Sequence, residues 1–252
     1  MKAAHPIVLL HGWASHPQVF RGLARALEKT ARVHLLPLPG YAAAATCAPY
    51  TLACMADAIA ALAPKQCSVI GWSLGAQVAL TWAQRAPQQV RRLALIAATP
   101  CFTQRNDWPH GTAASVMRQF TAQIQRDCPS VLRRFLALQS LGDAHAVSVA
   151  HKLRSALFTN PLPTQAVLEA GLDILRSADL RDVLASIAQP ALILHGAHDA
   201  VTPYAAGEAL SRALPNARLH TVANAGHAPF LTDLNAVATL LQAFLNEPAA
   251  TV

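Results

Sequence analysis

The sequence has no long hydrophobic run and is poor in charged and aromatic residues. Charged residues make up 13% of the 252 residues, and aromatic residues 6%. No stretch reaches the roughly 18 strongly apolar residues that a membrane span needs. Residues 1–11 hold one lysine and a short apolar run at 7–10, too brief for the core of a secretory signal. We therefore expect a cytoplasmic protein that does not enter the membrane.

The sequence also lacks a disulfide pattern and any run of basic residues. Its five cysteines are an odd set with no C-x-x-C pair, which predicts free thiols in a chain long enough to fold without disulfides. The net charge is +7, yet the 20 lysines and arginines are scattered. Nucleic acid is therefore not an expected partner, whereas an acidic partner stays open.

Short apolar runs alternate with helical patterns along most of the chain. Strands are predicted at residues 7–10, 33–38, 68–71, 93–97, 191–195 and 218–222. Helices are predicted between them at residues 19–29, 51–62, 75–85, 205–214 and 234–245. This alternation predicts an α/β fold, a mainly parallel sheet flanked by helices, with ligand chemistry at the carboxyl ends of the strands.

One region interrupts the alternation. Residues 106–184 contain no convincing strand, and helical patterns dominate, for example at 131–141 and 166–175. We expect a core made of residues 1–105 and 185–252, with residues 106–184 as a helical insertion. Because the insertion precedes the strand at 191–195, it is expected to form a lid above the carboxyl ends of the sheet.

The strongest local motif is G-W-S-L-G at residues 71–75, directly after a predicted strand and before a predicted helix. This context is typical of the nucleophile elbow of the α/β-hydrolase fold. The sharp turn exposes the hydroxyl of Ser73, and the flanking glycines avoid Cβ clashes. Ser73 is therefore the predicted nucleophile, in a pattern that chance seldom produces in this context.

A serine hydroxyl needs a base to take its proton, and the ordinary pKa of histidine suits that task. Of eleven histidines, His227 lies in the turn-like segment A-G-H-A-P after the last strand. The third member is a carboxylate that orients the base. Asp199 follows a strongly apolar strand and keeps the chain order Ser, Asp, His. Asp107, after the preceding strand, is its rival.

The oxyanion of the reaction needs two N–H donors. One is the backbone N–H that follows the nucleophile, here that of Leu74. The other is expected from the loop after the first strand, where His11-Gly12-Trp13 makes the Trp13 N–H the candidate. His195 and His198 have no partners at ligand spacing, so no metal site is expected.

The sequence resembles the pimeloyl-acyl carrier protein methyl ester esterases of biotin synthesis. The similarity covers nearly the whole chain and rests on residues 9–13, 71–75, 100–102, 107–109, 134–139, 171–175 and 226–230. The first two and the last of these motifs recur across many hydrolases. The middle four lie in or beside the helical insertion and are more specific.

The resemblance implies a serine carboxylesterase that hydrolyses the methyl ester of a pimeloyl chain attached to acyl carrier protein. It also implies that no cofactor is needed, and that these residues make the substrate surface: Trp13, Ser73, Leu74, Phe135, Leu136, Ala137, Leu138, Gln139 and His227. We expect a monomer. By itself, Phe135 would be read as an ordinary core aromatic of a helix.

The charges of the insertion agree with an acidic carrier protein as partner. Between residues 118 and 154, six basic residues stand against Asp127 and Asp143: Arg118, Arg126, Arg133, Arg134, Lys152 and Arg154. Such an excess would steer an acidic carrier toward the insertion. Taken singly, each of these side chains fits a solvated helix face equally well.

Two other functions stay open. A broad short-chain carboxylesterase would use the same Ser73, Asp199 and His227, so these residues do not discriminate it from the carrier-protein esterase. A hydrolase fold without catalysis, used as a small-molecule receptor, is the more distant alternative. The presence of all three residues argues against it.

Overall fold

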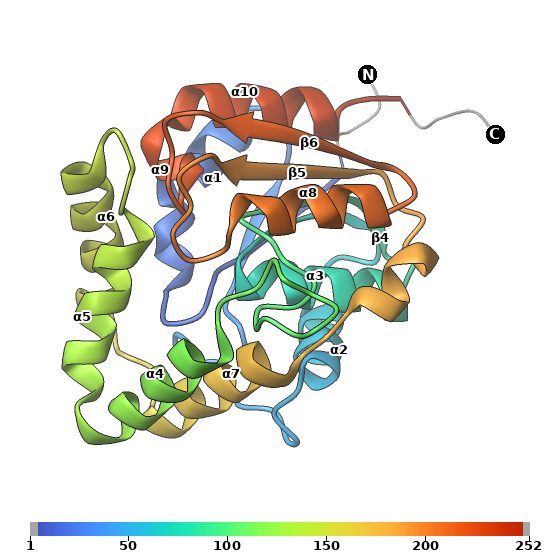
Figure 1. Cartoon of the computed structure of the whole chain (residues 1–252). Helices are drawn as coiled ribbons and strands as arrows, with labels where there is room; N and C mark the ends of the chain where they lie inside the picture. Colours follow the sequence, from blue (N-terminus) through green and yellow to red (C-terminus); the bar gives the residue numbers. More distant parts are fainter. Residues whose placement is uncertain (1–4, 249–252) are drawn as a thin grey trace.

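A six-stranded sheet lies at the centre of the computed structural model, which describes residues 5–248. Its strands are β1 (Ile7–Leu10), β2 (Val33–Leu36), β3 (Cys67–Trp72), β4 (Val90–Ile96), β5 (Ala191–Gly196) and β6 (Ala217–Val222). All neighbours are parallel, in the order β2-β1-β3-β4-β5-β6. Their carboxyl ends therefore meet at one edge, toward which the β5 and β6 arrows point in Figure 1.

Helices connect the strands and cover the sheet. They are η1 (Pro17–Phe20), α1 (Arg21–Leu27), α2 (Leu52–Leu62), α3 (Leu74–Arg85), α4 (Ala114–Arg126), α5 (Cys128–Gln139), α6 (Ala146–Phe158), α7 (Gln165–Ser177), η2 (Arg181–Ser186), α8 (Tyr204–Ala213), α9 (Pro229–Thr232) and α10 (Leu234–Leu245). Among residues 5–248, no helix combines the length and the apolar character that crossing a bilayer requires.

The strand residues alternate between two hydrophobic cores, one on each face of the sheet. On β3, Val69 packs in the core that α2, α3 and α8 cover, where Met55 is also buried. The next residue, Ile70, packs in the opposite core with Leu23 of α1 and Leu241 of α10. A central parallel strand buried on both faces is what its continuous apolar run predicts. The α/β architecture predicted from the sequence is confirmed.

The strand β2 is shorter than the sequence predicts. The expected strand 33–38 ends at Leu36, because Pro37 and Pro39 cannot donate ladder hydrogen bonds. The other strands are found within a few residues of their expected bounds.

Four helices, α4 to α7, occupy the chain between β4 and β5. Figure 1 shows α5 and α6 standing beside the carboxyl ends of β5 and β6, with α4 and α7 next to each other below. This is the segment in which the sequence predicts a helical insertion. Of the predicted core, residues 1–4 and 249–252 lie outside the described residues.

Candidate active site

Ser73 lies in a strained turn between β3 and α3. Its backbone has φ 56° and ψ −119°, a conformation that L-residues with a side chain rarely adopt. The hydrogen bond from its N–H to the Ile96 carbonyl (3.0 Å) fixes the turn against β4. The side chain is half-buried at the carboxyl edge of the sheet, as the elbow motif predicts.

The two glycines of the motif are required by close packing. A Cβ on Gly75 would lie 2.2 Å from the Leu10 carbonyl oxygen at the end of β1. A Cβ on Gly71 would lie 2.5 Å from the Gly75 carbonyl oxygen. The turn can be this tight only because both positions lack a side chain.

Asp199 and His227 are joined by a hydrogen bond. His227 Nδ1 lies 2.8 Å from Asp199 Oδ2, and because an ionised carboxylate only accepts, Nδ1 carries the proton. The other oxygen, Oδ1, accepts from the N–H groups of Val201 and Thr202, both at 2.8 Å. The acid follows β5 and the histidine follows β6, so adjacent strand ends bring them together.

The surroundings of Asp199 favour its charged form. Burial opposes ionisation, but the charge of His227 and the hydrogen bonds from His195 and His227 outweigh it, so the pKa of Asp199 lies below its ordinary value. His195 Nε2 lies 3.0 Å from the Thr202 carbonyl oxygen and 3.4 Å from Asp199 Oδ2. The carboxylate is therefore ionised at neutral pH and keeps the His227 ring in one tautomer.

The loop that carries His227 is hydrogen-bonded to Trp72, the residue before the serine. The indole Nε1 of Trp72 donates to the His227 carbonyl oxygen at 2.8 Å, and the two rings lie 5.6 Å apart. Within residues 5–248, the Nε2 atom of His227 is buried and has no hydrogen-bond partner. With Nδ1 protonated, this nitrogen has a free lone pair, which a general base requires.

The two expected oxyanion donors lie on adjacent segments. Neither the Leu74 N–H nor the Trp13 N–H donates to an acceptor in the described part of the chain. The loop that carries Trp13 lies against the elbow, because a Cβ on Gly12 would be 3.2 Å from Ser73 Cβ. Both amides therefore remain available beside the serine.

His11 fixes the shape of this loop, a role that the sequence alone did not reveal. Its Nδ1 donates to the Gly12 carbonyl at 2.9 Å, and its Nε2 accepts from the Leu38 N–H at 3.2 Å. Burial lowers the pKa of His11 to about 4, so the ring is neutral at pH 7. A neutral ring donates through one nitrogen and accepts through the other, as both contacts require.

Trp13 connects the loop to the helical insertion. Its Nε1 donates to the Leu168 carbonyl of α7 at 2.9 Å, and its ring packs edge-on against Phe135 of α5, with centroids 4.9 Å apart. A Cβ on Gly171 would lie 2.6 Å from Trp13 Cδ1. The glycine of the G-L-D-I-L motif thus makes room for the indole.

An apolar cavity of about 410 Å³ lies between the insertion and the strand ends. Trp13, Phe135 and Leu138 line it, together with Ala200 and Val201 next to the acid. The volume falls in the range of about 300–1,000 Å³ that is common for small-molecule pockets. Three of the nine expected substrate-binding residues therefore line this apolar cavity. Within the described chain, Ser73, Leu74 and His227 are not among its lining residues.

The rest of the expected segment 135–139 does not share this surface. Leu136 packs in the core on the α1 and α10 side of the sheet, Ala137 is exposed, and Gln139 is buried. The segment lies on the helix α5, where residues three apart, such as Phe135 and Leu138, share a face but consecutive residues do not. Within the described chain, Leu136, Ala137 and Gln139 do not line the cavity.

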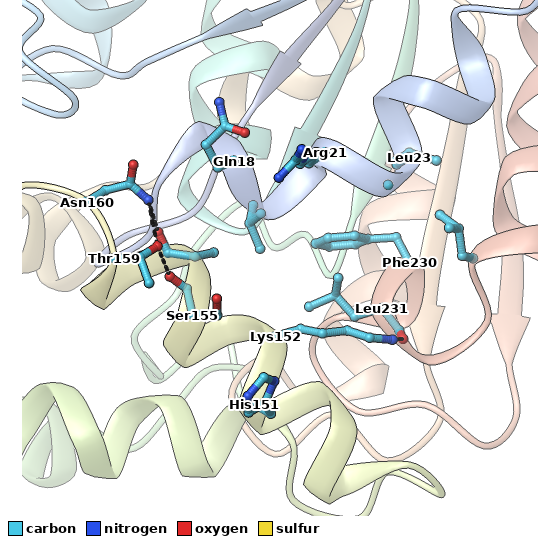
Figure 2. A pocket seen from close by; sticks show the side chains of 14 residues that line it. Gln18, Arg21, Leu23, His151, Lys152, Ser155, Thr159, Asn160, Phe230 and Leu231 are labelled. Carbon is cyan, nitrogen blue, oxygen red and sulfur yellow. Dashed lines mark hydrogen bonds between the residues drawn. The ribbon is translucent and has the colours of Figure 1, made fainter.

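The expected carrier-docking residues are all exposed on α4, α5 and α6: Arg118, Arg126, Arg133, Arg134, Lys152 and Arg154. Lys152 also lines a separate groove of about 560 Å³ that involves α1, α6 and α9 (Figure 2). In this groove its Nζ donates to the Leu231 carbonyl at 3.0 Å. All six expected docking residues are thus exposed on the insertion, and of these Lys152 also contacts the core through Leu231.

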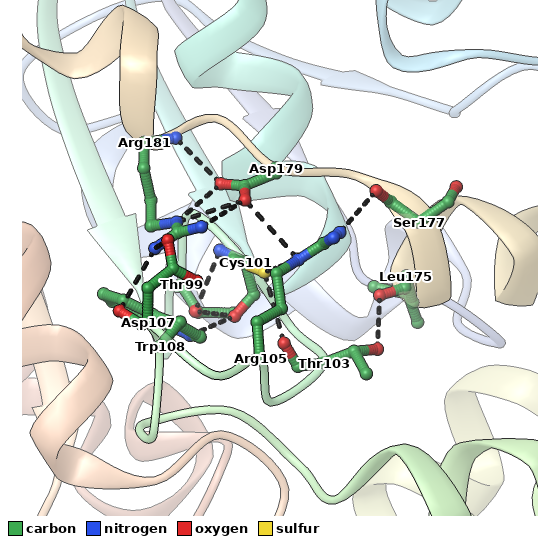
Figure 3. Close-up of polar contacts among 10 residues, drawn as sticks. All are labelled: Thr99, Cys101, Thr103, Arg105, Asp107, Trp108, Leu175, Ser177, Asp179 and Arg181. Atoms are coloured by element: carbon green, nitrogen blue, oxygen red, sulfur yellow. Dashed lines mark hydrogen bonds and ion pairs between the residues drawn. The ribbon is translucent and has the colours of Figure 1, made fainter.

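Asp107, the rival for the acid, lies elsewhere. Its carboxylate pairs with Arg181 (2.9 Å), which lowers the pKa of Asp107 through a hydrogen bond. Arg181 also pairs with Asp179, and Arg105 donates to the Ser177 carbonyl at 2.8 Å (Figure 3). Asp107 therefore belongs to a network that ties together the two ends of the helical insertion.

The comparisons with known proteins agree with this geometry. The family model of the alpha/beta hydrolase fold matches residues 5–234. Among solved structures, an esterase from Exiguobacterium antarcticum superposes with a TM-score of 0.88 at 25% identity, covering 98% of this chain and 94% of that one. A bromoperoxidase from Bacillus anthracis gives 0.86 at 18% identity, covering 97% and 92%. The predicted α/β-hydrolase fold is confirmed.

Two curated relatives are much more similar in sequence. A protein from Nitrosomonas europaea is 42% identical over 226 residues, 90% of this chain and 90% of that protein. A protein from Aromatoleum aromaticum is 42% identical over 241 residues, 94% and 96% of the two chains. Both are named pimeloyl-acyl carrier protein methyl ester esterase. The chain belongs to this esterase family of the α/β-hydrolase fold.

Proposed function

We propose that the chain hydrolyses the methyl ester of a pimeloyl group carried by acyl carrier protein, releasing methanol and pimeloyl carrier protein during biotin synthesis. The observation that carries the hydrolytic part of this proposal is the Asp199–His227 hydrogen bond of 2.8 Å at the same sheet edge as the elbow serine. The substrate is the one in the names of relatives that are 42% identical over nearly the whole chain.

In the acylation step, Ser73 Oγ attacks the carbonyl carbon of the methyl ester. His227 Nε2 takes the hydroxyl proton, and the resulting imidazolium is stabilised by Asp199 through Nδ1. The tetrahedral oxyanion is bound by the N–H groups of Leu74 and Trp13, each of which contributes about 3 kcal/mol of transition-state stabilisation. The intermediate collapses as His227 returns the proton to the methoxy oxygen, and methanol leaves.

The acyl-enzyme then joins Ser73 to the far end of the pimeloyl chain, whose other end remains a thioester of the carrier. A water molecule gives its proton to His227 and attacks the same carbonyl carbon. As the second tetrahedral intermediate collapses, His227 returns this proton to Ser73 Oγ, which restores the hydroxyl of Ser73 and frees the carboxylate. This sequence of steps needs no metal and no cofactor.

The apolar cavity supports the chain specificity of this proposal. Trp13, Phe135 and Leu138 offer a surface for the methylenes of the pimeloyl chain, which burial in an apolar site stabilises by about 0.8 kcal/mol each. The basic residues of the insertion, such as Arg133 and Arg134, are exposed and would contact the acidic carrier protein. The carrier and the acyl chain are thus recognised by different faces of the same helices.

We place the reaction in the cytoplasm and expect a monomer. All five cysteines are free thiols, which suits the reducing conditions of that compartment. Light scattering of the purified protein at assay concentration measures the oligomeric state directly.

The test compares kcat/KM for pimeloyl-carrier methyl ester with kcat/KM for a simple aryl acetate. The proposal predicts higher efficiency on the carrier-bound ester, which is lost when the carrier is replaced by a short thiol. Equal or better efficiency on the aryl ester, with no gain from the carrier, would identify a broad carboxylesterase instead. Absence of a Ser73 adduct with a serine-reactive phosphonate would indicate a non-catalytic binding protein.

A further inference from the structure

Residues 139–144, which form the turn between α5 and α6 and are called here the α5–α6 turn, lie directly on the loop that carries His227. The His227 N–H donates to the Gln139 carbonyl at 3.0 Å. The Ala144 N–H donates in the other direction, to the Asn224 carbonyl at 2.9 Å. The backbone of the base loop, residues 223–228, is thus hydrogen-bonded to the insertion at both of its ends.

Asp143 provides the side-chain contact between these segments. Its Oδ2 accepts from the Gly226 N–H at 3.0 Å and from the Thr232 hydroxyl, and its Oδ1 accepts from the His145 N–H at 2.7 Å. Asp143 is only 7% exposed, and no lysine, arginine or histidine of residues 5–248 forms an ion pair with it.

A buried carboxylate without a cation depends on the hydrogen bonds that it accepts. Such charge-assisted bonds are about twice as strong as bonds between neutral groups. For Asp143, the donors outside its own turn are Gly226, the residue before the base, and Thr232 of α9. Asp143 therefore holds the chain on both sides of His227, at Gly226 in the base loop and at Thr232 in α9.

The same turn also covers the loop of the acid. Gly142 has φ +78°, and a Cβ at this position would lie 2.9 Å from His198 Cβ and 3.3 Å from the His198 carbonyl oxygen. His198 precedes Asp199, and its N–H donates to the Ala225 carbonyl at 3.0 Å. The acid loop and the base loop are bonded to each other, and the α5–α6 turn packs on both.

We propose that Asp143 is a positioning residue for His227, acting from the helical insertion through the Gly226 N–H. This inference rests on the proposed function, in which His227 is the base. The α5–α6 turn then helps to set the orientation of the His227 imidazole. The insertion would support the base directly, in addition to covering the substrate.

The test uses Asp143→Ala, Asp143→Asn and Thr232→Val in the full-length protein, with Asp127→Ala as the matched control. Asp127 caps the opposite end of α5, accepting from the Ser130 N–H at 3.1 Å, and is exposed. Loss of such a cap removes about 1 kcal/mol of stability without touching the base loop. Three quantities are measured: kcat and KM on an aryl acetate, the unfolding free energy, and the downfield proton resonance of His227 Nδ1–H.

We expect Asp143→Ala to lower kcat by about 10- to 100-fold, the size of loss that a misplaced catalytic group produces, with KM nearly unchanged. The Nδ1–H resonance is expected to broaden or move. Asp143→Asn keeps one acceptor oxygen, so its kcat should lie between the kcat of Asp143→Ala and that of wild type. Thr232→Val keeps the bond between Asp143 and Gly226, so its kcat should fall less than that of either Asp143 variant. The control Asp127→Ala should keep kcat within about twofold of wild type.

The inference is overturned if the Asp143 variants that fold match Asp127→Ala in kcat and keep the wild-type resonance. If Asp143→Ala does not fold, Asp143→Asn gives the same comparison. Ser73→Ala in the same assay distinguishes failure of the proposed function from failure of the positioning role. If it keeps its activity, the proposed function fails; if it is inactive and the Asp143 series behaves like the control, only the positioning role fails.

Discussion

His227 donates its Nδ1–H to Asp199 Oδ2 over 2.8 Å, and both side chains are almost completely buried. The contact lies at the ends of two adjacent strands, so the central sheet fixes its geometry. Because the Asp199 carboxylate also accepts two backbone N–H groups, its orientation is set before any substrate binds. The His227 ring is thus held in one tautomer, with Nε2 free to accept a proton.

We expect Asp199→Asn to lower kcat by about 10⁴-fold, because an amide at this position no longer enforces the Nδ1–H tautomer. With its NH2 group toward His227, the amide oxygen can still accept from the Val201 and Thr202 N–H groups, so the unfolding free energy should fall far less than the activity does. Steady-state kinetics on an aryl acetate, together with urea unfolding, measure the two effects. A variant that retains more than about a tenth of the wild-type kcat contradicts the role of the acid.

The neutral, buried His11 predicts an acid-sensitive stability. Its folded pKa of about 4 lies below the ordinary value of 6.5, so the unfolded chain binds more protons in between. The contribution of neutral His11 to the free energy of unfolding is therefore complete above pH 6.5 and is lost as the pH falls toward 4. Urea unfolding at several pH values should show a smaller acid loss in His11→Gln than in wild type. Parallel pH curves for the two proteins would rule out this contribution.

Gly171→Val should damage the site through Trp13. The new side chain would overlap the indole, since even a Cβ would lie 2.6 Å from Trp13 Cδ1, and such overpacking costs about 1–3 kcal/mol. We expect a lower melting temperature and a raised KM for the pimeloyl ester. Asp173→Ala, which removes only a surface ion pair with Arg176 on the same helix, is the control. Equal effects of the two variants would show that the Trp13 contact is dispensable.

Arg134→Glu should raise KM for the carrier-bound ester several-fold and leave the small ester unchanged, because a rim charge acts on association with a charged partner. The effect should shrink as salt rises, since exposed charges are screened within about 10 Å at 0.1 M. The control is Arg91→Glu, an exposed arginine near the amino end of β4. Identical losses on both esters would indicate damage to the cavity instead of the docking surface.

The sequence predicted the elements and the positions of the Ser73, Asp199 and His227 residues because these depend on local patterns. Ser73 is marked by its two glycines, Asp199 by its position after a strongly apolar strand, and His227 by the turn-like segment after the last strand. For the helices α4 and α6, the sequence predicts only that they belong to a helical insertion and does not predict their bounds. Their polar faces are solvated, and their boundaries depend on packing against distant segments.

The supporting contacts could not be derived from the sequence. Nothing local distinguishes His11 from the other histidines; its role depends on Leu38, which lies 27 positions away. Likewise, Asp143 meets Gly226 across 83 positions. The contiguous segment 135–139 was assigned to one substrate surface, but the helix turns Leu136 to the opposite core. Such long-range pairings appear only in the folded chain.

The most direct test of the account measures methanol and free carrier thiol released from pimeloyl-carrier methyl ester by wild type and by Ser73→Ala, side by side. The proposed mechanism predicts one methanol for each ester consumed by wild type, no free carrier thiol, and almost no methanol from Ser73→Ala. Release of carrier thiol would show attack at the thioester instead, and methanol release by Ser73→Ala at the wild-type rate would show that Ser73 is not the nucleophile.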